Sequence, residues 1–207
     1  VKAWLAGEFG QPAEGITADL RSGTDVARAV AQAIARFGTI DVLVNCAAIF
    51  PVRRFEDFDD DQIATIFDVN VRGTMRLCHA VLPHLKAAGR GVIINIASGS
   101  AFTPIQGLTV YGASKAAVVA FSRSLALELA PQIRVNVVSP GTTASPAVVD
   151  AMAARGEAGF AEFLKHIPMG RLATPEDIAE GILFMASDRA SHITGTTLPV
   201  NGGSLMR

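Results

Sequence analysis

Hydrophobic residues along the chain follow two spacings in turn, one typical of strands and one typical of helices. Short apolar runs predict strands at residues 15–20, 40–45, 91–97, 134–139 and 196–200. The second and third runs are apolar through their middles, which is typical of strands covered on both faces. We therefore expect a largely buried sheet.

Apolar residues at helical spacing predict helices over residues 24–37, 60–85 and 111–129. Ser22 or Thr24 is placed to cap the first of them. Strands separated by helices of this length require right-handed crossovers and parallel pairing. The sequence therefore predicts an α/β fold, a Rossmann-like doubly wound parallel sheet in a three-layer α/β/α arrangement.

A further helix has a start signal of its own in the Thr-Pro-Glu-Asp sequence at residues 174–177. Thr174 is a capping residue, and Pro175 takes the first helical position, where its missing N–H costs nothing. The two acids that follow face the positive end of the helix dipole. No repeat, low-complexity segment or linker interrupts the chain, so we predict a single domain over residues 1–207.

The composition argues against several functional classes. Half of the 207 residues are hydrophobic, the net charge is −1 and no basic stripe is present, so we expect no nucleic-acid partner. Apolar stretches end well short of a membrane span, and the first residues lack the layout of a secretory signal. Neither the histidines nor Cys46 and Cys78 show a zinc-binding spacing, so we predict no metal site. Both cysteines lie in apolar sequence and are expected as buried free thiols in a reducing cytoplasm.

Small or polar residues follow the predicted strands at the points where ligands bind to such a sheet. In open α/β sheets, ligands lie outside the carboxyl ends of the strands. The residues in question are Asp19, 45–48, Ser98 and 140–141. Because each comes directly after a predicted strand, we expect one shared crevice.

Tyr111 and Lys115 are four residues apart at the start of a predicted helix, so both side chains project from one face. A phenol has an ordinary pKa of about 10, and a neighbouring ammonium lowers the pKa of a phenol by favouring the phenolate. Such a pair suits general acid/base chemistry. Taken alone, the spacing is more often that of a pair on a solvated helix face.

Two further polar residues have both a chemical and a structural interpretation. The Ser98 hydroxyl follows a strand and is placed to donate to a substrate oxygen, or else to bond to the local backbone. Asn70 lies within a predicted helix, where Asn is unfavourable. It is either part of a polar relay or a simple helix irregularity.

Together these residues resemble the classical short-chain dehydrogenase/reductase family. The matching motifs occur in the family's order and extend over essentially the whole chain. They are Asn-Cys-Ala-Ala at 45–48, Asn-Val at 70–71, Ile-Ala-Ser at 96–98, Tyr-Gly-Ala-Ser-Lys at 111–115, Pro-Gly at 140–141 and the glycine-containing end at 195–203.

The resemblance implies a role for each matching residue. Tyr111 resembles the catalytic acid/base, Lys115 the residue that assists it and holds the nicotinamide ribose, Ser98 the group that orients the substrate oxygen, and Asn70 the support of a proton-relay water. The implied cofactor is NAD or NADP. The implied cofactor-binding residues are Asp19, Leu20, Asn45, Ala47, Tyr111, Lys115, Pro140, Gly141, Thr143 and Ser145. Cys46 and Ala48 depart from the family's Asn-Asn-Ala-Gly turn, and Ser145 stands where Thr is usual.

The family's opening segment has no counterpart in this sequence. The family begins with a strand, a Gly-rich turn, a helix and a second strand, whereas this chain contains neither GxGxxG nor TGxxxGxG. Residues 1–10 resemble the end of the helix after that second strand. A parallel sheet without its central strand exposes unpaired backbone and apolar surface. We therefore expect this sequence to be incomplete at its front by a few tens of residues, with the first β-α-β unit missing from it, rather than to be a natural minimal enzyme.

The predicted function is NAD(P)-dependent interconversion of a secondary alcohol and a ketone. Resemblance to 3-oxoacyl-carrier-protein reductases and to sugar or polyol dehydrogenases is about equal. The alternatives are a non-catalytic nucleotide-binding relative and a truncated, inactive one. Residues 145–171 are expected to cover a small-molecule substrate, and family members usually form homotetramers or homodimers.

Overall fold

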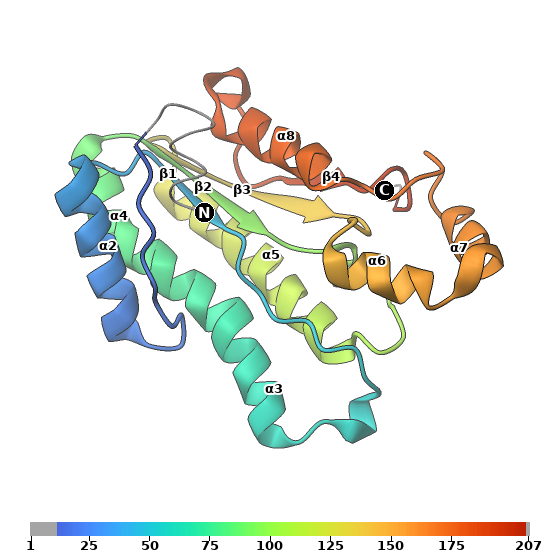
Figure 1. Ribbon diagram of the computed structural model, residues 1–207. Helices are drawn as coiled ribbons and strands as arrows, with labels where there is room; N and C mark the ends of the chain where they lie inside the picture. Colours follow the sequence, from blue (N-terminus) through green and yellow to red (C-terminus); the bar gives the residue numbers. More distant parts are fainter. Residues whose placement is uncertain (1–11, 206–207) are drawn as a thin grey trace.

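The computed structural model describes residues 12–205, which form a parallel sheet with helices on both faces (Figure 1). Residues 1–10, expected to end a helix, lie outside the described part. The strands are β1 (Val42–Asn45), β2 (Gly91–Ile96), β3 (Ile133–Pro140) and β4 (Thr197–Val200). They pair in parallel in the order β1-β2-β3-β4. The helices are α2 (Gly23–Phe37), α3 (Asp60–Phe67), α4 (Thr74–Ala88), α5 (Thr109–Leu129), α6 (Pro146–Ala153), α7 (Gly156–Leu164) and α8 (Pro175–Ala186).

Two hydrophobic cores lie on opposite faces of the sheet. Ile93 of β2 packs with side chains of α2, α4 and α5, whereas its neighbour Ile94 packs against α8. This alternation follows from the pleat, which directs successive side chains to opposite faces. The three-layer α/β/α prediction is confirmed, and Figure 1 shows α4 and α5 below the sheet and α8 above it.

The helix starts largely follow the sequence signals. Ser22, and not Thr24, caps α2 by accepting a hydrogen bond from the Asp25 backbone N–H. At α8, the Thr174 hydroxyl accepts from the Asp177 N–H while the Asp177 carboxylate accepts from the Thr174 N–H at 2.8 Å. The predicted cap of this helix is confirmed. No helix among residues 12–205 is long and apolar enough to cross a membrane.

The predicted helix over residues 60–85 is one continuous run with a change of geometry inside it. A π-helical segment, Asp68–Gly73, separates α3 from α4. Gly73 permits close packing there, because a Cβ on this residue would lie 2.9 Å from the Leu20 Cβ. Such π turns occur often at functional sites.

Two predictions about the edge of the sheet are wrong. Residues 15–20 do not form a strand, because none of the described strands pairs with them. Their chain is held instead in a turn in which Ser22 N–H donates to Asp19 O. The strand at 40–45 exists but is not fully covered: Val42 is 42% exposed and Val44 39% exposed. β1 pairs only with β2 among the described strands, and α8 packs on β2, β3 and β4.

A chain of buried polar side chains crosses the centre of the fold. Asn45 and Asn95 are register partners on β1 and β2, and Asn45 Nδ2 donates to Asn95 Oδ1 at 2.8 Å. Asn95 Nδ2 in turn donates to the Ser122 hydroxyl of α5, also at 2.8 Å. All three residues are buried. Because buried amides are costly without partners, this chain fixes the position of α5 on the strands.

We expect Ser122→Ala to lower the free energy of unfolding by about 1–3 kcal/mol, because it leaves the buried Asn95 amide without an acceptor. Ser124→Ala is the matched control, since Ser124 is an exposed serine of the same helix. Urea denaturation measures both. Equal stabilities of the two variants would contradict the assigned role.

Candidate active site

A cavity of about 480 Å³ lies at the carboxyl ends of the strands, as the sheet type requires. Its wall includes Ser98, two residues after the end of β2, and Pro140 and Gly141 at the end of β3. Tyr111 and Lys115, from the first turns of α5, complete this part of the wall. Figure 1 shows the arrowheads of β2 and β3 directed toward α6 and α7, which supply further lining residues. The predicted shared crevice is confirmed for these strand ends.

Lys115 is a buried ammonium beside Tyr111. The residue is 3% exposed, and its Nζ donates to the Ile96 carbonyl at 2.8 Å and lies 5.8 Å from the centroid of the Tyr111 ring. Burial lowers the pKa of Lys115 to about 8. One N–H is bonded to Ile96, so the ammonium keeps donors for a ligand.

Burial raises the pKa of Tyr111, and the side-chain hydrogen bond with Ser98 opposes that rise. The direction is opposite to the lowering expected from the neighbouring ammonium. The reason is desolvation: removing the phenol from water penalises the charged phenolate. Tyr111 therefore holds its proton firmly in this structure.

The loop after β2 sets the position of Ser98. The Ser98 hydroxyl accepts hydrogen bonds from the backbone N–H and the hydroxyl of Ser100, at 3.2 and 3.0 Å. The loop packs directly on α5 at Gly112, where a Cβ would lie 2.8 Å from the Ser100 carbonyl oxygen. Ser98 therefore bonds locally, as its structural interpretation predicts, and also lines the cavity, while its donation to a substrate oxygen stays a prediction.

Asn70 does not line the cavity; it connects three segments behind it. Its Nδ2 donates to the Ile49 carbonyl at 2.9 Å and to the Ser114 hydroxyl at 3.0 Å, while its Oδ1 accepts from the Ile49 N–H. Ser114 lies between Tyr111 and Lys115 in α5 and donates to the Tyr111 carbonyl. Asn70 lies in the π-helical segment, so the helix is irregular at this residue. Its amide also takes part in a network of polar contacts.

The predicted cofactor residues divide into two groups. Those on the cavity wall are Tyr111, Lys115, Pro140, Gly141, Thr143 and Ser145. Gly141 is required there because a Cβ would lie 2.8 Å from the Asn201 Cα. Ser145 caps α6 by accepting from the Val148 N–H.

The others, Asp19, Leu20, Asn45 and Ala47, do not line this cavity. Asp19 is paired with Arg21, whose guanidinium lowers the pKa of the carboxyl to about 2. Leu20 packs against Gly73 of the π-helical segment. Asn45 is buried and donates to Asn95, and its own Oδ1 has no hydrogen-bond partner. Ala47 is exposed but does not line the cavity.

The cavity wall corrects one expectation and adds residues that the sequence did not indicate. Cys46 was expected to be buried but is exposed and lines the cavity, whereas Cys78 is buried as expected. His166, within the stretch expected to cover the substrate, is exposed and also lines the cavity. Thr103, Ile105 and Ser204 line it too, although no local pattern in the sequence indicated them.

The residues present fit the nicotinamide end of a dinucleotide. A cavity of this size accepts a ligand of a few hundred cubic ångströms. Lys115 offers unused ammonium donors, and Gly141 lines the same cavity.

Comparison with known proteins identifies the protein family to which the chain belongs. The family model for enoyl-(acyl carrier protein) reductase matches residues 3–204. The chain is 40% identical over 199 residues to the short-chain reductase protein NovJ of Streptomyces niveus, covering 94% of this chain and 75% of NovJ. It is 37% identical over 195 residues to the 2,3-dihydro-2,3-dihydroxybenzoate dehydrogenase of Escherichia coli strain K12, covering 91% of this chain and 79% of that one.

Among solved structures, a 3-ketoacyl-(acyl-carrier-protein) reductase from Brucella melitensis, complexed with NADH, superposes with a TM-score of 0.88. The identity is 37%, and the match covers 99% of this chain and 84% of the other. The chain therefore belongs to the short-chain dehydrogenase/reductase family. It is an NAD(P)-dependent oxidoreductase that acts on CH–OH groups and interconverts alcohols and ketones.

We expect a thiol-alkylating reagent to modify Cys46 and to spare Cys78, because burial raises the pKa of Cys78 to about 12 and keeps it a protonated thiol. Bound NAD(P) should slow the modification of Cys46, since this residue shares the cavity with Lys115. Mass spectrometry of peptides measures both, with Cys46→Ser as the control. Alkylation at an unchanged rate with saturating cofactor would place the cofactor elsewhere.

Proposed function

We propose that this enzyme interconverts a secondary alcohol and a ketone of a small-molecule substrate with Tyr111 as the proton donor and acceptor. The observation that carries this proposal is the convergence of Ser98, Tyr111 and Lys115 on one cavity. A merely structural Tyr-Lys pair would lie on a solvated helix face, whereas Lys115 is buried. A non-catalytic relative has no use for this combination.

In ketone reduction, Tyr111 gives its hydroxyl proton to the substrate oxygen while that oxygen accepts a hydrogen bond from Ser98. In alcohol oxidation, the Tyr111 phenolate takes the proton of the substrate hydroxyl. The nicotinamide, when bound, supplies or accepts the hydride at the carbinol carbon. General acid/base assistance of this kind contributes roughly 10²–10⁴ in rate.

Lys115 and Asn70 have supporting roles in this proposal. Lys115 holds the nicotinamide ribose with its free donors and stabilises the phenolate when it forms. Asn70 is a positioning residue: through Ser114 it fixes the turn of α5 that carries Tyr111, and through Ile49 it fixes the loop beside the cavity. A proton-relay water beside Lys115 is consistent with this arrangement.

The rest of the proposal concerns assembly and location. The outer face of α5 exposes small residues at Ala113, Ala116 and Ala120 and an apolar one at Leu127, which is 85% exposed. Small side chains favour close helix pairing, so this face supports a homodimer or homotetramer. The free thiols Cys46 and Cys78 support a reducing compartment such as the cytoplasm.

We expect Tyr111→Phe to reduce kcat by roughly 10²-fold or more, because it removes the transferable proton and little else. Binding of NAD(P), followed by fluorescence, should change little and serves as the control for folding. Turnover at the original rate in this variant would contradict the proposed mechanism.

The pH dependence of kcat/KM should show the Lys115 ionisation, because this parameter reports the free enzyme. With its pKa at about 8, Lys115 is protonated below that pH and loses its charge above it. Tyr111 stays protonated over this range because burial raises its pKa. Ketone reduction should therefore be constant below pH 8 and decline above it, because the neutral amine no longer stabilises the phenolate that forms as Tyr111 gives up its proton. A reduction profile that stays flat to pH 10 would be inconsistent with this assignment.

A further inference from the structure

The wall of the cavity contains basic side chains but no acidic ones among the described residues. Among the residues that the structure describes, none of those lining the cavity is Asp, Glu or Arg. The groups able to carry positive charge are Lys115 and His166. The Lys115 ammonium already bonds to the Ile96 carbonyl and serves the cofactor in the proposed function. His166 is thus a hydrogen-bond donor and potential cation of this wall to which the mechanism gives no role.

His166 is held in place by the segment that follows it. Its N–H donates to the Phe163 carbonyl at the end of α7, and the next residue, Ile167, is buried. Ile167 packs where Gly202 has no side chain, since a Cβ there would lie 2.8 Å from the Ile167 Cγ2. Met169 N–H donates to the Gly202 carbonyl at 3.0 Å.

This contact joins two segments on one part of the wall. The stretch 167–169 lies on the loop 201–203, and Gly203 contacts Pro168 in the same way as Gly202 contacts Ile167. Ser204, the residue after this loop, also lines the cavity. His166 and Ser204, which belong to two segments in contact, therefore line the same cavity. Both groups donate hydrogen bonds, and a carboxylate accepts several at once.

We infer that His166 and Ser204 form a subsite that binds a carboxylate on the substrate, so that the enzyme acts on small hydroxy acids and keto acids. The inference rests on the proposed function, which places the reacting carbon at Ser98 and Tyr111. A wall without acidic side chains imposes no repulsion on an anion, and it offers no counter-charge to a cationic substrate.

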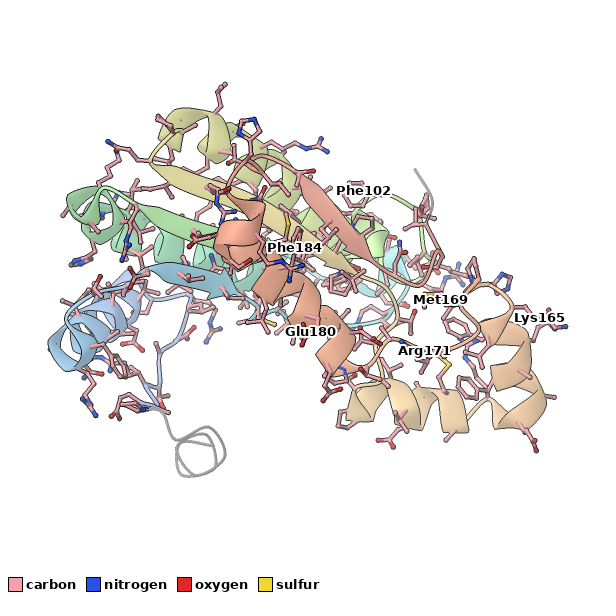
Figure 2. All side chains as sticks on the ribbon, turned by 90° about the horizontal axis from the view of Figure 1, so that it is seen from above. Phe102, Lys165, Met169, Arg171, Glu180 and Phe184 are labelled. Atoms are coloured by element: carbon pink, nitrogen blue, oxygen red, sulfur yellow. The ribbon has the colours of Figure 1, made fainter. Side chains whose placement is uncertain are left out.

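Lys165 provides a matched control next to His166. It is exposed, forms an ion pair with Glu162, and does not line the cavity. Figure 2 shows Lys165 at the outer edge of the molecule, beyond α7, while Met169 and Arg171 lie on the side facing α8. Removing the charge of Lys165 therefore changes the net charge near the site by the same amount without touching the subsite.

The test compares ketones that differ only in the carboxylate. Binding of levulinate and methyl levulinate, and of acetoacetate and methyl acetoacetate, is measured by calorimetry on the full-length enzyme with oxidised cofactor, where the ketone is not turned over. We expect each acid to bind at least about tenfold more tightly than its ester, since hydrogen bonds to charged groups contribute at this level. His166→Phe should abolish this preference, His166→Gln should retain part of it, and Lys165→Gln should leave it unchanged.

Equal binding of acid and ester, or a preference that survives in His166→Phe, would overturn the subsite. A preference that Lys165→Gln also removes would show a general charge effect and overturn it too. Turnover of the same compounds with reduced cofactor is measured in a separate experiment, which tests the proposed mechanism. Tight acid binding that depends on His166 supports the subsite even if Tyr111→Phe keeps full activity, an outcome that would refute only the proposed mechanism.

Discussion

The hydrogen bond between the Lys115 ammonium and the Ile96 carbonyl is the constraint on which the rest of the site depends. A buried ammonium is expensive to keep charged, and this contact compensates part of the cost while joining α5 to the end of β2. It brings the first turns of α5, with Tyr111, beside Ser98, the second residue after β2. The active site is thus a consequence of how one helix is fastened to one strand end.

The same helix is held by further polar contacts along its length. Asn70 reaches Ser114 near the catalytic end, and the amide chain through Asn95 reaches Ser122 about two turns later. Polar contacts are directional, so together they fix both the rotation and the axial position of α5 in a way that apolar packing alone does not. The π-helical segment belongs to this arrangement, because it carries Asn70 at its buried centre.

The fold and the residues proposed as catalytic could be predicted because their signals are local. The spacing between Tyr111 and Lys115, the start of α8 at Thr174 and the apolar runs of β2 and β3 each depend on a few neighbouring residues, and the structure confirms them. The strand expected at 15–20 was wrong because a strand requires a partner, and apolar pattern carries no information about the partner. The direction of the Tyr111 pKa was wrong because spacing reports a nearby ammonium but not the depth of burial.

The sequence by itself determined the family, most of the strands and helices, and the residues proposed to move a proton, because these follow from short-range pattern and from side-chain chemistry. Only the tertiary structure decided that Cys46 is exposed, that His166 lines the cavity while Asp19 and Ala47 do not, and that Asn70 bonds to Ser114. These placements depend on contacts between segments far apart in the chain, such as 167–169 on 201–203. Such contacts are set by packing at the end of the sheet and leave no trace in local sequence.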